Sequence, residues 1–223
     1  MSIRFLSCEE ADVFHRLDPR RYAAQLNGMT LPFRITVCGL AELDLHRDAK
    51  VSHVLSILDP EWPVPEEFGT YGEHAKLELR FHDIIENEPE LLPPQRFHVA
   101  QLLEFGRTLE REPIGQAHLL VHCHAGVSRS TASMAVILAQ AQPARPAEAA
   151  FDKVLRIRPG AWPNLRIVEL ADALLGRQGE LVAAAHGVYR RQAVRRPELV
   201  DVMRSSGRGR EVETVTADAV PQC

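Results

Sequence analysis

Residues 118–132, HLLVHCHAGVSRSTA, decide the fold of this 223-residue chain. The short apolar run at their start predicts a buried strand, and the run that follows the loop is apolar nearly all round, which predicts a buried helix. Cys123 and Arg129 enclose a loop of five residues between the two elements. A loop this short can curl so that its backbone N–H groups converge on one anion. Gly126 allows the positive φ that such a curl needs.

The two ends of this loop suit reactions of phosphate esters. Converging N–H groups, the helix dipole and the Arg129 guanidinium all favour an anionic sulfur, so Cys123 is predicted to be a thiolate nucleophile. The planar guanidinium can bind two phosphate oxygens at once, and the Ser130 hydroxyl can donate to the sulfur when it leaves. Cys and Arg at a fixed spacing alone are weak evidence, but this combination between a strand and a helix is specific. The alternative is a buried structural cysteine beside a surface arginine.

Strands alternate with helices on both sides of the loop. The remaining strands are predicted at about 33–38, 51–58 and 76–81, and the remaining helices at about 95–109, 146–157 and 164–175. This alternation predicts an α/β fold with a central, mostly parallel sheet flanked by helices. Ligands bind such sheets at the carboxyl ends of their strands, which is where Cys123 lies.

The chain is predicted to have four parts. They are a lead-in over residues 1–30, a catalytic domain over 31–176, a helical extension over 177–205 and a tail over 206–223. The chain becomes polar and rich in arginine after the catalytic domain. The tail has few apolar residues and is predicted to be disordered.

Composition narrows the range of functions. The net charge of −4 argues against bulk binding to nucleic acid or to an acidic membrane surface. The four cysteines are scattered, without the paired spacing of a zinc site or a disulfide framework. We find neither a signal peptide nor an apolar run approaching about 18 residues. These features predict a soluble, cytoplasmic protein in a reducing compartment, which an unpaired nucleophilic cysteine requires.

The loop also carries a resemblance to a known family. HCHAGVSRS, residues 122–130, is similar to the signature of the cysteine-based protein tyrosine phosphatases, and most similar to their dual-specificity branch. The resemblance extends over about residues 33–175 through the segments VSHVLSI, HAKLELRFHDI, LLVHCHAGVSRSTA and IRPGAWPN. It implies a phosphatase-like fold and hydrolysis of phosphate monoesters through a phosphocysteine, without a cofactor. It also implies a phosphorylated protein or peptide as substrate, whereas the net charge predicts no nucleic acid or membrane partner.

Thiolate attack must expel an alkoxide or phenoxide, so a general acid is needed opposite the nucleophile. The resemblance places this acid on a loop after a strand, some thirty to forty residues before the cysteine, and Asp83 fits because it follows the strand KLELRF. Asp59, which ends an earlier strand, and Glu86, which lies near Asp83, are the alternatives. Asp83 is also compatible with a turn or a helix cap.

The other candidate residues surround the loop. Those predicted to contact substrate are His124, Ala125, Gly126, Val127 and Ser128, together with Arg129. His122 is expected to orient the loop by hydrogen bonding, whereas Asn164 matches the family's closing asparagine or is a simple helix N-cap. The histidines lack a convincing metal-ligand spacing, so no metal is predicted.

The loop also bears on the substrate. It has no lysine of the kind that phosphoinositide phosphatases of this superfamily carry, and the recognition loop of the large tyrosine-specific enzymes has no counterpart here. A protein tyrosine or dual-specificity phosphatase is therefore the preferred interpretation. The alternatives are a phosphatase for a nucleotide, an RNA end or a lipid, and a phosphate-binding module without turnover.

Overall fold

The computed structural model describes residues 31–217, so the predicted lead-in over 1–30 and the end of the predicted tail lie outside the described residues. The chain divides after Pro32, and the elements below belong to the unit that begins at Phe33. The predicted strands and helices are confirmed, with ends that differ by one or two residues.

Four parallel strands form the sheet. They are β1 (Arg34–Cys38), β2 (His53–Leu58), β3 (Ala75–Arg80) and β4 (His118–His122). Their spatial order is β1-β4-β2-β3, so β4 lies between two neighbours and its carboxyl end is in the middle of the sheet. Every residue of β2 and β4 is buried, as expected for central strands covered on both faces.

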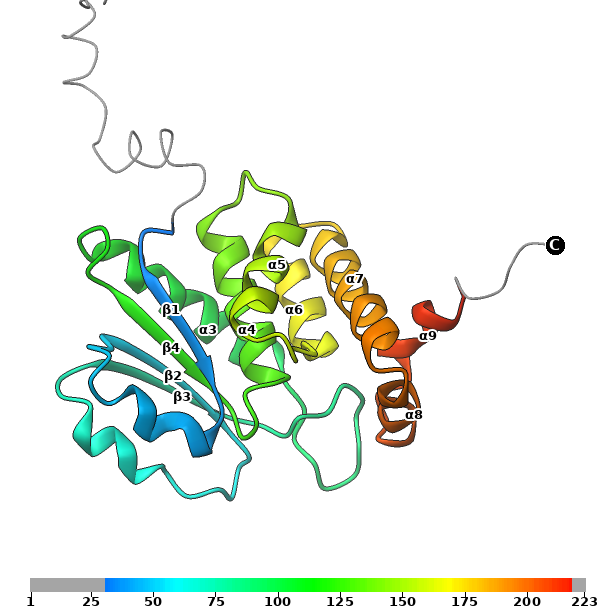
Figure 1. Cartoon of the computed structure of the whole chain (residues 1–223), viewed down its shortest axis with the longest axis horizontal. Coiled ribbons are helices and arrows are strands. Elements are labelled where there is room, and N and C mark those ends of the chain that lie inside the picture. The colour runs from blue at the N-terminus through cyan, green and yellow to red at the C-terminus, as the bar shows by residue number, and fades with distance from the viewer. Residues whose placement is uncertain (1–30, 218–223) are drawn as a thin grey trace, which may run out of the picture. The chain divides into compact units, whose positions relative to one another are not determined.

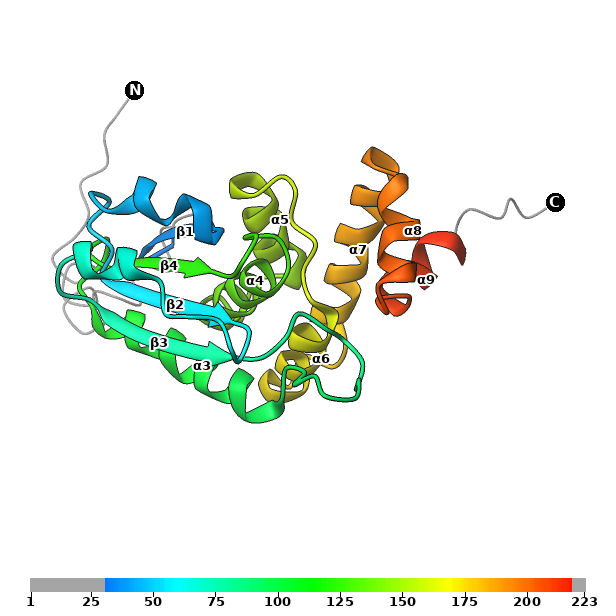
Figure 2. The same cartoon turned by 90° about the horizontal axis from the view of Figure 1, so that it is seen from below.

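Helices supply the other layers. Those after β3 are α3 (Arg96–Thr108), α4 (Arg129–Ala141), α5 (Ala147–Ile157), α6 (Leu165–Leu175), α7 (Glu180–Arg195), α8 (Glu198–Ser205) and α9 (Arg210–Ala217). The short 3-10 helices are η1 (Leu40–His46), η2 (Glu66–Thr70) and η3 (Leu109–Arg111). Figures 1 and 2 show α3, α4 and α5 beside the sheet, and α7, α8 and α9 farther from it.

The opposite face of the sheet is covered by η1 and η2. Leu43 from η1 and Phe68 from η2 pack with Val54 and Leu120 of the central strands. The Tyr71 hydroxyl donates to the backbone of Leu43 and so joins the two short helices. Both faces of the sheet are therefore dry, which lets the aliphatic strands pack at the density of a protein interior.

Helix α4 is the central helix of the molecule. Its residues from Arg129 to Ala139 are all buried, which confirms the helix predicted to be apolar nearly all round. It packs against α3, α5 and α6 and against the strands β1 and β4. Its N-terminus therefore points at the loop that follows β4, with little freedom to move.

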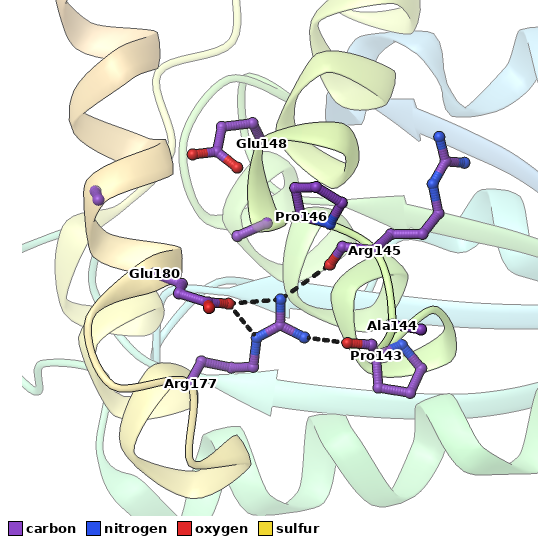
Figure 3. A pocket seen from close by; sticks show the side chains of 9 residues that line it. Pro143, Ala144, Arg145, Pro146, Glu148, Arg177 and Glu180 are labelled. Carbon is purple, nitrogen blue, oxygen red and sulfur yellow. Dashed lines mark hydrogen bonds and ion pairs between the residues drawn. The ribbon is translucent and has the colours of Figure 1, made fainter.

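A recess of about 440 Å³ opens between the α4–α5 connection and the start of α7. The Arg177 guanidinium reaches across it, donating to the backbone oxygens of Pro143 and Arg145 and pairing with Glu180 (Figure 3). These bonds engage the Arg177 guanidinium and link the α6–α7 connection to the α4–α5 connection across the recess. It contains none of the predicted site residues.

The C-terminal part of the chain differs from the prediction. The predicted helical extension contains α7 and α8, but the tail predicted to be disordered from residue 206 forms α9. Glu211 and Val212 of α9 are fully buried, and Arg208 is nearly so. The prediction was wrong over 206–217, because a buried ion pair replaces the apolar contacts whose scarcity indicated disorder.

In the part of the chain that the structure describes, no helix is long and apolar enough to cross a bilayer.

Two pairs at i,i+3 spacing provide a matched test of α9 docking. Arg208–Glu211 is buried, whereas Arg204–Asp201 on α8 is exposed. Removing one partner of a buried pair leaves an uncompensated charge, so Glu211→Ala should lower the free energy of unfolding by about 3 kcal/mol or more. Asp201→Ala should lower it by less than about 1 kcal/mol. Urea unfolding measures both, and equal effects would show that the buried Arg208–Glu211 pair contributes no more to the stability of the docked α9 than an exposed pair does.

Candidate active site

The loop between β4 and α4 is curled tightly against the end of β1. Gly126 has φ of +68°, as the sequence predicts. A Cβ at this position would lie 2.5 Å from the carbonyl carbon of Cys38 and 2.6 Å from the Gly39 nitrogen, closer than any side chain tolerates. Both the backbone conformation and the close approach therefore require glycine.

The carbonyl groups of the loop all bond outward. His124 O accepts from Leu40 N at 2.9 Å, and Val127 O accepts from Trp162 N at 2.9 Å. The intervening oxygens of Ala125 and Gly126 accept from a guanidinium. In a trans peptide the N–H points opposite to the C=O, so the amides of residues 125–128 face the inner side of the curl. These N–H groups donate to no other described residue, and they form a nest suited to an oxyanion.

The guanidinium of Arg158 donates these two hydrogen bonds to the outer side of the loop. Its Nε donates to Gly126 O at 3.0 Å and its Nη2 to Ala125 O at 2.9 Å. Its Nη1 is held at 2.7 Å by Glu42, which also accepts from the Gly39 N–H. The hydrogen bond from Arg158 lowers the pKa of Glu42, so the pair is ionised. This clamp fixes the orientation of the loop peptides.

Cys123 lies at the base of the curl. It is 3% exposed, and its Sγ is 3.2 Å from the Ser130 hydroxyl on the first turn of α4. Cys38 is also a free thiol at the end of β1. Burial raises the pKa of Cys38 to about 12, so that thiol is un-ionised and inert at neutral pH.

The Arg129 guanidinium is buried and held from one side. Its Nη1 donates to the Asp59 carboxylate and to the Phe81 backbone oxygen, both at 2.6 Å. Its Nε is buried and has no partner among the described residues. An unpaired buried donor of this kind is costly, and an anion at the curl would satisfy it. Asp59 and Phe81 thus orient the fork while leaving the Nε side for a ligand.

Asp83 lies beside the C-terminal end of the loop, next to Ser128. Its Oδ1 accepts from the Ser128 hydroxyl at 2.7 Å and from the Asn164 amide at 2.9 Å. Its Oδ2 accepts no hydrogen bond from the described residues, and the carboxyl group is 30% exposed. The Asn164 Oδ1 also caps α6 by accepting from Ile167 N at 3.1 Å. Both interpretations of Asn164, the helix cap and the partner of the loop, therefore hold together.

The two alternatives to Asp83 are differently engaged. Asp59 pairs with Arg129, and its backbone N–H donates to His124 Nε2 at 3.3 Å. Glu86 pairs with Arg210 near the C-terminus and contacts none of the loop residues. Asp83 accepts from the uncharged donors of Ser128 and Asn164, whereas Asp59 is committed to Arg129 through Oδ1 and lies 3.8 Å from His124 Nδ1 through Oδ2.

The connection after β2 packs against the loop through Asp59 and Trp62, which both contact His124. The Trp62 ring lies 4.4 Å from that of His124, and Trp62 is 46% exposed. Arg80 donates to the backbone oxygens of Asp59 and Trp62 and so holds the connection in place. The His124 side chain is 24% exposed, which leaves it accessible at the edge of the curl. Burial lowers the pKa of His124, so its ring is neutral at pH 7.

His122, at the end of β4, is fully buried. Its Nε2 is 2.8 Å from the Ser56 hydroxyl on β2. This contact ties the two central strands together one residue before Cys123. Burial lowers the pKa of His122 to about 4, so the ring is neutral at physiological pH.

The structure brings the predicted loop residues together with Asp83 and Asn164. Sequence reasoning missed Glu42, Arg158 and Trp62. Arg158 lies in the segment IRPGAWPN, and Trp62 follows the strand predicted at 51–58, but nothing in their spacing indicates a contact with residues 123–129. Among residues 31–217, no group of three or more His, Cys, Asp or Glu is arranged to hold a metal ion.

Solved structures share this architecture. The Cydia pomonella PTP-2 phosphatase aligns over 63% of this chain and 84% of its own, with 22% identity and a TM-score of 0.50. The chain has the fold of the cysteine-based phosphatases. The expectation from the sequence resemblance is thus confirmed at the level of fold.

Other structures with this phosphatase fold are similar at lower scores. Human DUSP28 matches with 17% identity and a TM-score of 0.48, over 64% of this chain and 94% of its own. A mouse putative dual specificity phosphatase complexed with zinc tungstate matches with 18% identity and a TM-score of 0.47, over 69% and 87%. No family model matches the chain, and the comparison with curated proteins found no match.

The buried His122 predicts a pH dependence of stability. Its pKa of about 4 in the folded state lies below the ordinary value of 6.5, so the folded chain resists protonation. The associated stability is fully present above pH 6.5 and is lost as the pH falls toward 4, by up to about 3 kcal/mol. In His122→Gln the loss between pH 7 and pH 4 should shrink by a similar amount in urea unfolding. An unchanged pH profile would contradict this assignment.

The Arg158 clamp predicts an effect on anion binding. Arg158→Met removes the donors to Ala125 and Gly126 while retaining most of the side-chain volume. The loop amides should then lose their fixed orientation, and the affinity for inorganic phosphate or tungstate should fall about tenfold, the equivalent of one charged hydrogen bond. Arg156→Met, an exposed position on the same turn, is the matched control and should bind normally. Equal affinity in both variants would mean that the clamp is dispensable.

Proposed function

We propose that this chain is a phosphomonoester hydrolase that acts through a phosphocysteine at Cys123. One observation carries the proposal: the outward carbonyls of residues 124–127 leave the amides of residues 125–128 on the inner side of the curl, and Arg129 Nε has no partner among the described residues. Such a nest with a guanidinium fits the three equatorial oxygens of a phosphoryl group in transfer. The fold shared with phosphatases agrees with this assignment.

In the first step the Cys123 thiolate attacks phosphorus and the bond from phosphorus to the ester oxygen breaks. Asp83 donates its proton, from Oδ2, to the leaving oxygen, while Oδ1 is held by Ser128 and Asn164. Arg129 and the loop amides stabilise the charge on the equatorial oxygens throughout. The alcohol or phenol leaves, and the phosphoryl group remains on sulfur.

In the second step water attacks the phosphocysteine. The Asp83 carboxylate accepts a proton from that water, and the bond between phosphorus and sulfur breaks to release inorganic phosphate. The Ser130 hydroxyl, 3.2 Å from the sulfur, donates to the departing thiolate. Asp59 acts differently, since it orients the Arg129 guanidinium. The cycle needs no cofactor or metal ion.

We further propose a phosphorylated protein as the substrate, with phosphotyrosine preferred. Two features support this choice. The exposed Trp62 beside His124 offers an aromatic surface to a phenyl ring. The carboxylates of Asp59 and Asp83 flank the loop, and an additional phosphate there would be repelled. A free thiol in this role suits the reducing cytoplasm, where we propose that the protein acts.

A panel of substrates tests the proposal. We expect wild type to hydrolyse an aryl phosphate and phosphotyrosine peptides, and to act more slowly on phosphoserine peptides, phosphoinositides and nucleotides. Cys123→Ser should lose essentially all turnover yet still bind phosphate, because a hydroxyl is a far weaker nucleophile than a thiolate. Preference for a nucleotide or lipid would keep the mechanism and overturn the substrate assignment. Retained turnover in Cys123→Ser would overturn the mechanism itself.

Two aspartate variants belong in the same panel. Asp83→Asn should lower kcat by roughly 10²–10³ on phosphotyrosine and much less on phosphates of acidic phenols, whose departure needs little proton assistance. Asp59→Asn should lower turnover of all substrates by a similar factor, since it acts through Arg129. If the dependence on the leaving group appears in Asp59→Asn instead, the roles of the two residues must be exchanged.

A further inference from the structure

The segment Gly207–Val212, termed here the C-terminal strap, inserts a charged pair into the body of the molecule. The Arg208 and Glu211 side chains are 9% and 0% exposed, and their shortest contact is 2.7 Å. Arg208 Nε makes a second bond to the same carboxylate at 2.8 Å. Burial of two charges is costly, so a pair maintained in this position calls for a reason beyond stability.

Glu211 anchors the strap next to the candidate active site. Its carboxylate accepts from Trp162 Nε1 at 2.6 Å and from Leu165 N at 3.0 Å. Leu165 is the first residue of α6 and directly follows Asn164, the residue that binds Asp83. The strap is therefore attached to the same helix N-terminus that holds the proposed general acid.

Arg208 extends from this anchor to Asp83. Its Nη1 lies 3.5 Å from Asp83 Oδ1, the oxygen that also accepts from Ser128 and Asn164. Burial alone would lower the pKa of Arg208, but the Asp83 and Glu211 carboxylates raise it above its ordinary value, so the guanidinium stays charged. Arg208 thus places a fixed positive charge on one side of the Asp83 carboxyl group.

The neighbouring residues of the strap hold the rest of the Asp83 loop. Arg210 pairs with Glu86 and Glu169, and its Nη2 contacts the Ile85 backbone oxygen at 3.4 Å. The connection that carries Asp83 is therefore bonded at Asp83, Ile85 and Glu86 to a segment more than one hundred and twenty residues later in the chain. Figure 1 shows α9 on the outer side of the helical layers, beside α7 and α8.

We propose that Arg208 is a positioning residue for catalysis, which holds Asp83 so that its Oδ2 faces the leaving group. This inference rests on the proposed function, in which Asp83 is the general acid. Three donors, from Ser128, Asn164 and Arg208, fix Oδ1 and leave the second oxygen to carry the transferable proton. Without the cation, the carboxyl group gains freedom to rotate, and proton transfer becomes less efficient.

The test requires a variant that removes the cation without leaving Glu211 buried and unpaired. Arg208→Met/Glu211→Gln removes both charges, and the single amide oxygen of the glutamine retains an acceptor for one of the two donors, Trp162 Nε1 or the Leu165 N–H. Thermal melting verifies that the double variant folds. Arg208→Lys, which keeps the charge near Glu211, is the conservative variant, and the exposed Arg204→Ala on α8 is the control.

The readout is kcat against the acidity of the leaving phenol. The double variant should lose about tenfold on phosphotyrosine and less than about twofold on the phosphate of a strongly acidic phenol, with partial recovery in Arg208→Lys. In an Asp83→Asn background the same changes should cost nothing further, because the two residues act as a unit. Arg204→Ala should match wild type.

Other outcomes distinguish a failure of the inference about Arg208 from a failure of the proposed role of Asp83. An equal loss on all leaving groups, or a further loss in the Asp83→Asn background, would show a merely structural role and overturn the inference while the proposed function stands. Wild-type kinetics in the double variant would also overturn the inference alone. If Asp83→Asn itself has no dependence on the leaving group, the acid assignment fails, and the positioning role fails with it.

Discussion

The opposed directions of C=O and N–H within each peptide unit are the constraint on which the site depends. Because residues 124–127 direct their carbonyls toward protein donors, the amides of residues 125–128 are left facing the interior of the curl. The donors come from η1, from the residue after α5 and from the segment before α6. The nest at Cys123 is therefore produced by packing around the loop as much as by the loop sequence.

The same logic extends to the side chains. Arg129 is oriented by acceptors after β2 and β3, and Asp83 is oriented by Ser128, Asn164 and Arg208. In the proposed mechanism, each of these side chains is bonded on the side away from the reacting phosphoryl group, and the opposite side is left for the substrate. This is how a fold preorganises charges at no cost during the reaction.

The local features of the fold could be predicted from the sequence because they depend on neighbours in the chain. The strand before Cys123, the buried helix after Arg129 and the positive φ of Gly126 follow from hydrophobic period and steric freedom. The contacts of Arg158 with Glu42 could not be predicted in this way. They join positions 116 residues apart, and an isolated arginine and glutamate have no pattern that indicates a partner.

The C-terminal strap was misread for a related reason. A glutamate in a polar segment is normally exposed, so the composition around Glu211 indicated disorder. In the folded chain four N–H donors, from Arg208, Trp162 and the Leu165 backbone, replace water around its carboxylate. Only the three-dimensional arrangement reveals that this compensation exists.

The most direct measurement of the central claim is the location of the phosphoryl group during turnover. Wild-type protein is mixed with an aryl phosphate, quenched in acid within one turnover and mapped by peptide mass spectrometry. The account predicts a phosphoryl group on the sulfur of Cys123, formed at least as fast as the steady-state rate and absent in Cys123→Ser. Turnover without any phosphorylated intermediate, or a phosphoryl group on His124 instead, would contradict the account.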